Sequence, residues 1–200
     1  MDFAELLLTK RSAIINKWFD YIVETYPPDT VTFLRRQKDA MANPVGSSIR
    51  DGLAGVIDCL IAGVQGRDIT EYSVDWNALE PHFDRIVRIR ALQNFAPSQS
   101  VRFAAELDRI LWRVLAKEAK DQGLETELKA LTALMGDFIF LAFDVYAACR
   151  ERLFDIRVKD EQRRVALLLR RANIVTDIDK PEYDLPDLRE DRSETNHEER

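Results

Sequence analysis

The chain contains few of the residues that interrupt helices, with only seven glycines and seven prolines among 200 positions. Glycine and proline mark turns and loops, so their scarcity leaves little room for long irregular connections. From Glu125 to about Asn173 no strong helix breaker is evident, and a helix of that length would extend about 70 Å. The sequence therefore predicts an all-α fold with a long C-terminal helix.

Start and stop signals divide the preceding part of the chain into shorter helices. The clearest start is Asn43-Pro44. An asparagine at the N-cap accepts hydrogen bonds from orphan backbone N–H groups, and a proline at the next position has no N–H to leave unpaired. We expect helices over residues 3–25, 29–40, 44–66, from about 81 to 95, and 97–120.

One edge of the expected helix 44–66 carries small residues three or four positions apart: Gly52, Gly55, Cys59 and Gly63. Glycine inside a helix costs about 1 kcal/mol relative to alanine. Several on one side predict that another helix crosses very closely there. Poor packing or fraying near the end of the helix is the alternative.

Arg90 lies in the middle of an apolar arc formed by Phe83, Ile86 and Val87, when residues are placed at about 100° per step. A buried charge needs a partner. The arginine therefore either contacts an anion or carboxylate ligand in a helical pocket, or makes an ion pair that fixes two helices. Asp137 and Asp144, in the most apolar window of the chain, are expected to be buried as well and to need partners.

Charge is distributed unevenly along the chain. Residues 177–200 hold ten acids and four bases, which account for the whole net charge of −6 and leave a neutral body. A neutral body offers no broad basic footprint, so nucleic acid is not an expected partner. The polar segment 174–200 is predicted to be an acidic disordered tail.

The expected location is the cytoplasm. A secreted disulfide framework would normally have more than two cysteines, and the N-terminus is a poor signal peptide. Asp137 and Asp144 would each cost about 2.5–3.5 kcal/mol near a bilayer centre, so membrane insertion is not expected.

Residues 151–173 show an imperfect coiled-coil register, in which Phe154, Val158, Val165 and Leu168 are the apolar positions and Glu161 is the flaw. This pattern predicts a homodimer formed through the long helix. Two ordinary helices with a kink near Lys159 are the alternative.

The sequence contains no arrangement typical of catalysis. It lacks the P-loop, strand-linked dinucleotide-binding and HExxH motifs, and His82 is expected at the surface. We therefore expect no catalytic residues, no metal ligands and no cofactor.

Two segments, ETYPPDTVTFLRRQKDAMANPVGSSIRDGL (24–53) and IVRIRALQNFAPSQSVRF (86–103), resemble the amino-terminal domain of the RsbR/RsbRD family, which are RsbT co-antagonists and regulators of sigma factor. The resemblance implies a globin-like sensor domain that binds no haem, dimerises and normally leads into a STAS domain. Arg90, Gln93, Ser98 and Gln99 stand at motif positions of the family, without a catalytic role to transfer. Only a short acidic tail follows the long helix here.

Together these patterns predict a globin-like sensor domain over 1–150, a helical extension over 151–173 and a tail over 174–200. The expected function is a non-enzymatic sensory module of bacterial stress or sigma-factor signalling type. It would act as a homodimer on an unknown protein partner, without a STAS domain. The alternative is a globin-like protein that binds a small ligand or haem.

Overall fold

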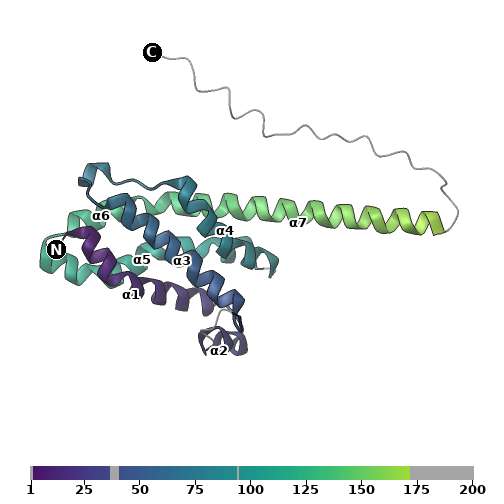
Figure 1. Cartoon of the computed structure of the whole chain (residues 1–200), viewed down its shortest axis with the longest axis horizontal. Coiled ribbons are helices and arrows are strands. Elements are labelled where there is room, and N and C mark those ends of the chain that lie inside the picture. Colours follow the sequence, from purple (N-terminus) through teal and green to yellow (C-terminus); the bar gives the residue numbers. More distant parts are fainter. Residues whose placement is uncertain (1, 37–40, 94, 172–200) are drawn as a thin grey trace, which may run out of the picture. The chain divides into compact units, whose positions relative to one another are not determined.

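The computed structural model describes residues 2–36, 41–93 and 95–171, and all of the regular structure in these ranges is helical (Figure 1). The all-α prediction is therefore confirmed for this part of the chain. The predicted acidic tail, 174–200, lies outside the described residues. The helices are α1 Phe3–Val23, α2 Pro28–Arg36, α3 Pro44–Val64, η1 Ile69–Glu71, α4 Trp76–Leu92, α5 Pro97–Gln122, α6 Glu125–Ala133 and α7 Met135–Arg171.

The chain divides into two compact units, Met1–Phe154 and Asp155–Arg200. The first unit contains α1 to α6 and the first part of α7. In this unit α3 packs on both α1 and α4, and α1 also packs on α5. The described part of the second unit is the rest of α7, up to Arg171.

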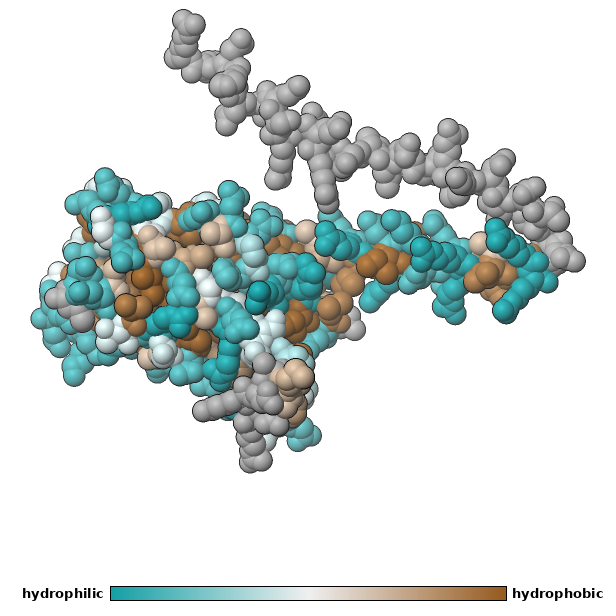
Figure 2. Space-filling view, in the orientation of Figure 1, coloured by the Kyte–Doolittle hydropathy of each residue, from teal (hydrophilic) through white to brown (hydrophobic). Residues whose placement is uncertain are grey.

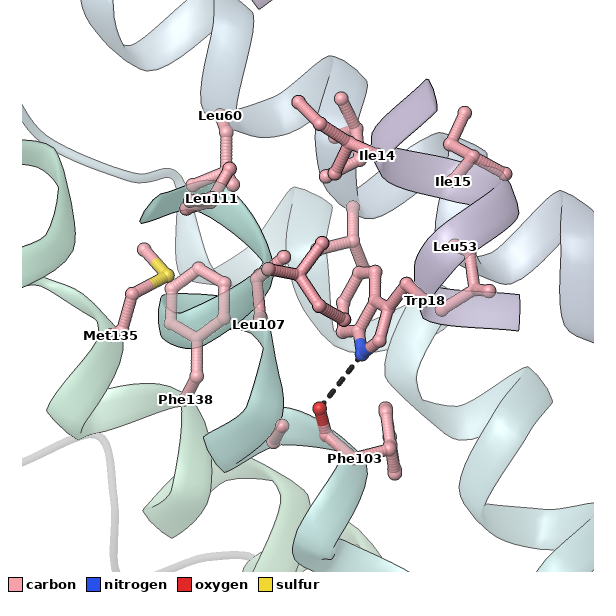
Figure 3. Close-up of a cluster of buried hydrophobic side chains, with 14 of the residues drawn as sticks. Ile14, Ile15, Trp18, Leu53, Leu60, Phe103, Leu107, Leu111, Met135 and Phe138 are labelled. Atoms are coloured by element: carbon pink, nitrogen blue, oxygen red, sulfur yellow. Dashed lines mark hydrogen bonds between the residues drawn. The ribbon is translucent and has the colours of Figure 1, made fainter. Parts of the chain in front are cut away.

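The core of the first unit is formed by the inner faces of these helices (Figure 3). Trp18 of α1 is fully buried, and its indole Nε1 donates to the backbone carbonyl of Phe103 in α5 at 2.7 Å. The Phe103 ring in turn lies 5.7 Å from that of Phe83 in α4, which meets Phe138 of α7 edge-on at 5.6 Å. These aromatic contacts connect four helices through one continuous core.

Most helix ends lie within about three residues of the predicted ones, and two boundaries differ more clearly. Helix α4 begins at Trp76 rather than near Pro81, because the Asp75 carboxylate caps the N–H groups of Asn77 and Ala78. The long run from Glu125 is also interrupted between α6 and α7. There the N–H of Leu134 donates to the Leu131 carbonyl at 3.1 Å, which tightens the turn and ends α6.

Helices α3 and α4 approach each other closely along the glycine-bearing edge. A Cβ atom built on Gly52 would lie 2.9 Å from the backbone oxygen of His82, and one built on Gly55 would lie 2.0 Å from the imidazole Nδ1 of His82. Gly63 lies against the loop after η1, where a Cβ atom would be 2.1 Å from the Ser73 backbone oxygen.

Cys59, on the same edge of α3, is partly buried. His82 is half-buried, not at the surface as expected, because Gly55 leaves room for its ring.

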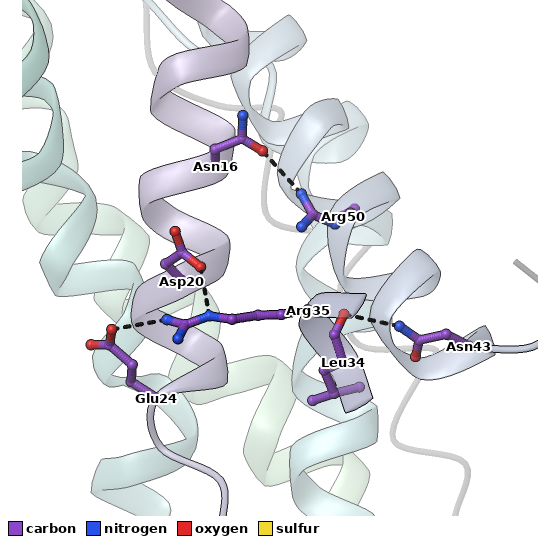
Figure 4. Close-up of polar contacts among 7 residues, drawn as sticks. All are labelled: Asn16, Asp20, Glu24, Leu34, Arg35, Asn43 and Arg50. Atoms are coloured by element: carbon purple, nitrogen blue, oxygen red, sulfur yellow. Dashed lines mark hydrogen bonds and ion pairs between the residues drawn. The ribbon is translucent and has the colours of Figure 1, made fainter. Parts of the chain in front are cut away.

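The connection from α1 through α2 to α3 is held by polar side chains (Figure 4). Arg35 of α2 pairs with Asp20 and Glu24 of α1, at 3.0 Å in each case. Asn43 is buried, caps the N–H of Gly46 at 2.8 Å and donates to the Leu34 carbonyl at 3.1 Å. These contacts fix the end of α1, which carries part of the candidate site.

The predicted burial of Asp137 and Asp144 is wrong, since both are exposed in the first unit. The first part of α7 buries only one face, which carries Met135, Phe138, Ala142, Val145 and Tyr146. Its other face leaves Ile139, Phe140 and Phe143 at the surface. The apolar composition of this segment suggested burial all round, but only one side meets the core.

Within the described residues one helical stretch, in Glu125–Arg171, is long and apolar enough to cross a membrane by length and composition. Of its most apolar window, 33% is buried in the fold. The core helices of soluble proteins meet the same criterion, so this finding is weak evidence for a membrane span.

Candidate functional site

Arg90 is the largest buried charged side chain in the described part of the chain, with 1% of its surface exposed. It lies on the inner face of α4 beside Ile86 and Val87, as its position in the apolar arc predicts. Its guanidinium donates from Nη1 to the hydroxyl of Thr25 at 3.1 Å and from Nη2 to the backbone carbonyl of Gln99 at 2.9 Å. It therefore joins the end of α1, the last turn of α4 and the first turn of α5.

Two aromatic rings complete the surroundings of the guanidinium. Its central carbon lies 4.3 Å from the ring centre of Phe95 and 5.8 Å from that of Tyr26. The two rings meet edge-on, with centroids 5.1 Å apart. The Tyr26 hydroxyl donates to the Gln93 side-chain oxygen at 2.8 Å. Aromatic faces attract a cation, so these rings offset part of the cost of burying the arginine.

Neither Asp137 nor Asp144 pairs with Arg90, and among the described residues no carboxylate forms an ion pair with it. The structural ion pair, one of the two alternatives for Arg90, is therefore not formed among the described residues, where neutral oxygens and aromatic faces surround the charge instead. Burial lowers the pKa of Arg90 from its ordinary value, and Tyr26 partly opposes that shift. Burial likewise raises the pKa of Tyr26, and Arg90 opposes it.

The other predicted site residues lie at the turn between α4 and α5. Gln93 follows the last residue of α4 and holds Tyr26. The Gln99 side-chain oxygen accepts from the backbone N–H of Ala96 at 3.2 Å, which stabilises the start of α5. The backbone carbonyl of Gln99 accepts from Arg90. Ser98 is exposed. Neighbouring Ser100 is fully buried, and its hydroxyl has no hydrogen-bond partner among the described residues.

A cavity of about 250 Å³ lies beside Arg90. It is lined by Tyr21, Ile22, Glu24, Thr25, Arg90, Gln99, Arg102 and Phe103. Sequence reasoning identified Arg90 and Gln99 but not Thr25 or Arg102. Thr25 belongs to the segment 24–53 that carries the family resemblance, yet only folding brings its hydroxyl 3.1 Å from a residue 65 positions away.

The described residues contain no group of three or more His, Cys, Asp or Glu side chains placed to hold a metal ion. The chemistry available at the cavity is instead that of a cationic binding site. Two arginines and a hydroxyl offer hydrogen-bond donors, while Ile22 and Phe103 provide apolar wall. The fold and this site together define an all-α domain with an arginine-lined cavity between its helices.

The chain belongs to the family described as the RsbT co-antagonist protein rsbRD N-terminal domain, whose family model matches residues 12–160. This family is one of regulatory domains in sigma-factor signalling. An uncharacterized protein of Archaeoglobus fulgidus is 26% identical over 162 residues, covering 79% of this chain and 89% of that protein. No solved structure matches the chain.

The segments that carry the resemblance meet at the candidate site. Thr25 and Tyr26 belong to the first segment, whereas Arg90, Gln93 and Gln99 belong to the second. The hydrogen bonds from Arg90 to Thr25 and from Tyr26 to Gln93 join the two segments directly. The motif residues thus form one structural cluster rather than two separate helix ends.

Proposed function

We propose that this chain is a non-enzymatic, cytoplasmic sensory module of sigma-factor signalling type, which forms a homodimer through α7 and acts on a protein partner. The observation that carries the proposal is the apolar surface of α7. In the first unit Phe140 is 69% exposed and Phe143 is 52% exposed. Isolated exposed apolar side chains are ordinary, but several on one helix indicate a contact surface.

The second unit also carries exposed apolar residues that support the dimer. Val158, Val165 and Leu168 are exposed on its helix, with Leu168 at 63%. In Figure 2 hydrophobic patches alternate with hydrophilic ones along this part of α7. The spacing of these three residues follows a coiled-coil register, in which a second copy of the same helix would cover them. A second copy presents the same apolar positions at the same spacing, so its helix would pack against this one.

The sensory part of the proposal rests on the first unit. Its cavity lies where α1, α4 and α5 meet. A ligand that moved Arg90 would alter the hydrogen bonds that join the ends of all three helices. The family membership supports a regulatory output carried by protein contacts rather than by a reaction. A globin-like topology would agree with this role and is part of the proposal.

Native mass spectrometry of the full chain tests the dimer. We expect a dimer for the unaltered protein and a monomer when Val165→Asp and Leu168→Asp are combined. The matched control combines Arg163→Asp and Arg170→Asp, which place two aspartates on the opposite side of the same helix at about 100° per residue. The control should remain a dimer. A monomeric unaltered chain, or a dimer that survives the first pair of changes, would refute the proposal.

A further inference from the structure

We propose that the cavity beside Arg90 is a binding site for a small organic carboxylate. Arg90 would bind the carboxylate group together with Arg102, and the apolar wall would hold the organic body of the ligand. The proposal deepens the sensory role proposed above, since it names the class of signal, and it rests on that role for its biological meaning. The binding itself can be measured separately.

The first argument is the unsatisfied hydrogen-bonding capacity of Arg90. A guanidinium carries five N–H donors. Among the described residues Thr25 and Gln99 accept from its Nη atoms and the Tyr26 hydroxyl lies near it, but its buried Nε has no partner. A buried cation without a counter-charge is costly, and a bound carboxylate would supply both the charge and the missing acceptors.

The second argument is the charge around the cavity. Arg102, in the first turns of α5, lines it and is exposed, and no ion pair ties it to another described residue. Glu24 is the one acid in the lining, and its carboxylate accepts from Arg35 at 3.0 Å. With that acid paired, the two lining arginines leave the site positive. An anion is therefore favoured over a cation or a neutral ligand.

The third argument is the size and polarity of the cavity. About 250 Å³ is below the roughly 300–1,000 Å³ of sites for drug-sized ligands, so the ligand should be small. Ile22, Tyr21 and Phe103 contribute hydrocarbon and aromatic surface to the lining. A bare oxyanion such as phosphate would leave that surface against water, whereas an organic acid would cover it. The geometry thus favours a carboxylate on an apolar body.

Isothermal titration calorimetry on the full chain provides the test, with butyrate, benzoate, inorganic phosphate and uncharged benzyl alcohol as probes. We expect at least one of the two carboxylates to bind, and phosphate and benzyl alcohol to bind at least tenfold more weakly. Arg102→Gln should weaken carboxylate binding about tenfold, equivalent to about 1.4 kcal/mol. Arg85→Gln is the matched control, because Arg85 is exposed on α4 and does not line the cavity. It should leave the affinity unchanged.

Arg90→Lys provides a second variant, since it keeps the charge and removes the planar fork of donors. It should weaken carboxylate binding while circular dichroism shows the helical fold intact. Failure of both carboxylates to bind would overturn the proposal. Tighter binding of phosphate would also overturn it, in favour of an inorganic oxyanion site. Equal affinities in Arg102→Gln and Arg85→Gln would place binding elsewhere and overturn it too.

The outcomes separate this inference from the proposed dimer. A monomeric chain that binds benzoate would refute the dimer and leave the site in place. A dimer that binds neither carboxylate would do the reverse.

Discussion

Arg90 donates from Nη2 to the backbone carbonyl of Gln99 at 2.9 Å, so that the last turn of α4 is tied directly to the first turn of α5. The short connection between these helices leaves the carbonyl within reach of a side chain nine residues earlier. The same guanidinium reaches Thr25 at the end of α1. A single side chain therefore sets the positions of three helix ends around the cavity.

Removal of this side chain should destabilise the domain. Arg90→Ala loses two hydrogen bonds from a charged donor and the contact with Phe95, but it also removes the cost of burying a charge. We expect a decrease of about 2–3 kcal/mol in the free energy of unfolding, measured by urea denaturation. Arg85→Ala, on the exposed side of the same helix, should change it by less than about 0.5 kcal/mol. Equal effects of the two substitutions would contradict the assigned role of Arg90.

Gly63 should not tolerate a side chain. Its built Cβ atom lies 2.1 Å from the Ser73 backbone oxygen, and the Ser73 N–H donates to the Gly63 carbonyl at 3.3 Å. Backbone on both sides cannot move without loss of packing, so Gly63→Ala should cost about 1–3 kcal/mol in urea denaturation. Gly136→Ala in α7 is the control, because apart from its chain neighbours and the backbone of its own helix no atom lies within 4 Å of its Cβ position. That substitution should stabilise the helix by about 0.5–1 kcal/mol. The prediction fails if both glycines respond alike.

The close approach of α3 and α4 predicts a change of sign in a double-mutant cycle. The Cβ position of Gly55 lies 2.0 Å from Nδ1 of the His82 ring. Gly55→Ala should therefore destabilise the unaltered protein, since the ring must leave its place. In the background of His82→Ala the same substitution should instead stabilise, by up to about 1 kcal/mol, because only the helix propensity remains. Thermal denaturation of the four proteins measures the coupling, and additive effects would show that the two residues do not clash.

Cys149 should be slow to alkylate, and its reactivity should depend on Asp84. Burial is the main cause that raises the pKa of the Cys149 thiol, and the Asp84 carboxylate, 3.8 Å from the sulfur, raises it further. Arg88, which pairs with Asp84 at 2.7 Å, acts in the opposite direction. Asp84→Asn should lower the pKa, increase the thiolate fraction near pH 8 and speed alkylation severalfold.

Mass spectrometry of iodoacetamide-treated protein measures both cysteines in the same sample. Cys59 serves as the internal control, because burial and then Asp58 and Asp75, not Asp84, raise the pKa of its thiol. Its rate should stay the same. A parallel increase at Cys59 would indicate general loosening of the fold and not a local electrostatic effect.

Much of the helical organisation follows from local signals. Asn43 and Pro44 predicted the start of α3, and the cap is present with Asn43 bonded to the N–H of Gly46. The start of α5 near Pro97 was likewise predicted, and in the structure this helix ends at Gly123, which has a left-handed φ of 71°. Such signals are readable because a cap or a left-handed turn depends on a few neighbouring positions. Asp75 shows the limit of this approach, since its cap started α4 five residues before the proline that seemed the stronger signal.

The candidate site was only half predictable. Arg90 was identified because a charge inside an apolar arc conflicts with the helix period around it. Thr25 and Arg102 carried no such conflict, and Asp137 and Asp144, the polar residues of the apolar window, were wrongly expected to be buried. Which residues meet a buried arginine is a matter of distance between separate helices, and the period of one helix does not contain that information.

By itself, the sequence determined the all-α class, most helix starts and the presence of one misplaced charge, because these depend on composition and on residues within a turn of each other. Only the tertiary structure decided that neutral oxygens and aromatic rings surround Arg90 and that α7 buries one face of its first part. Both outcomes depend on how helices distant in sequence pack, since an apolar side chain is buried only where another element covers it.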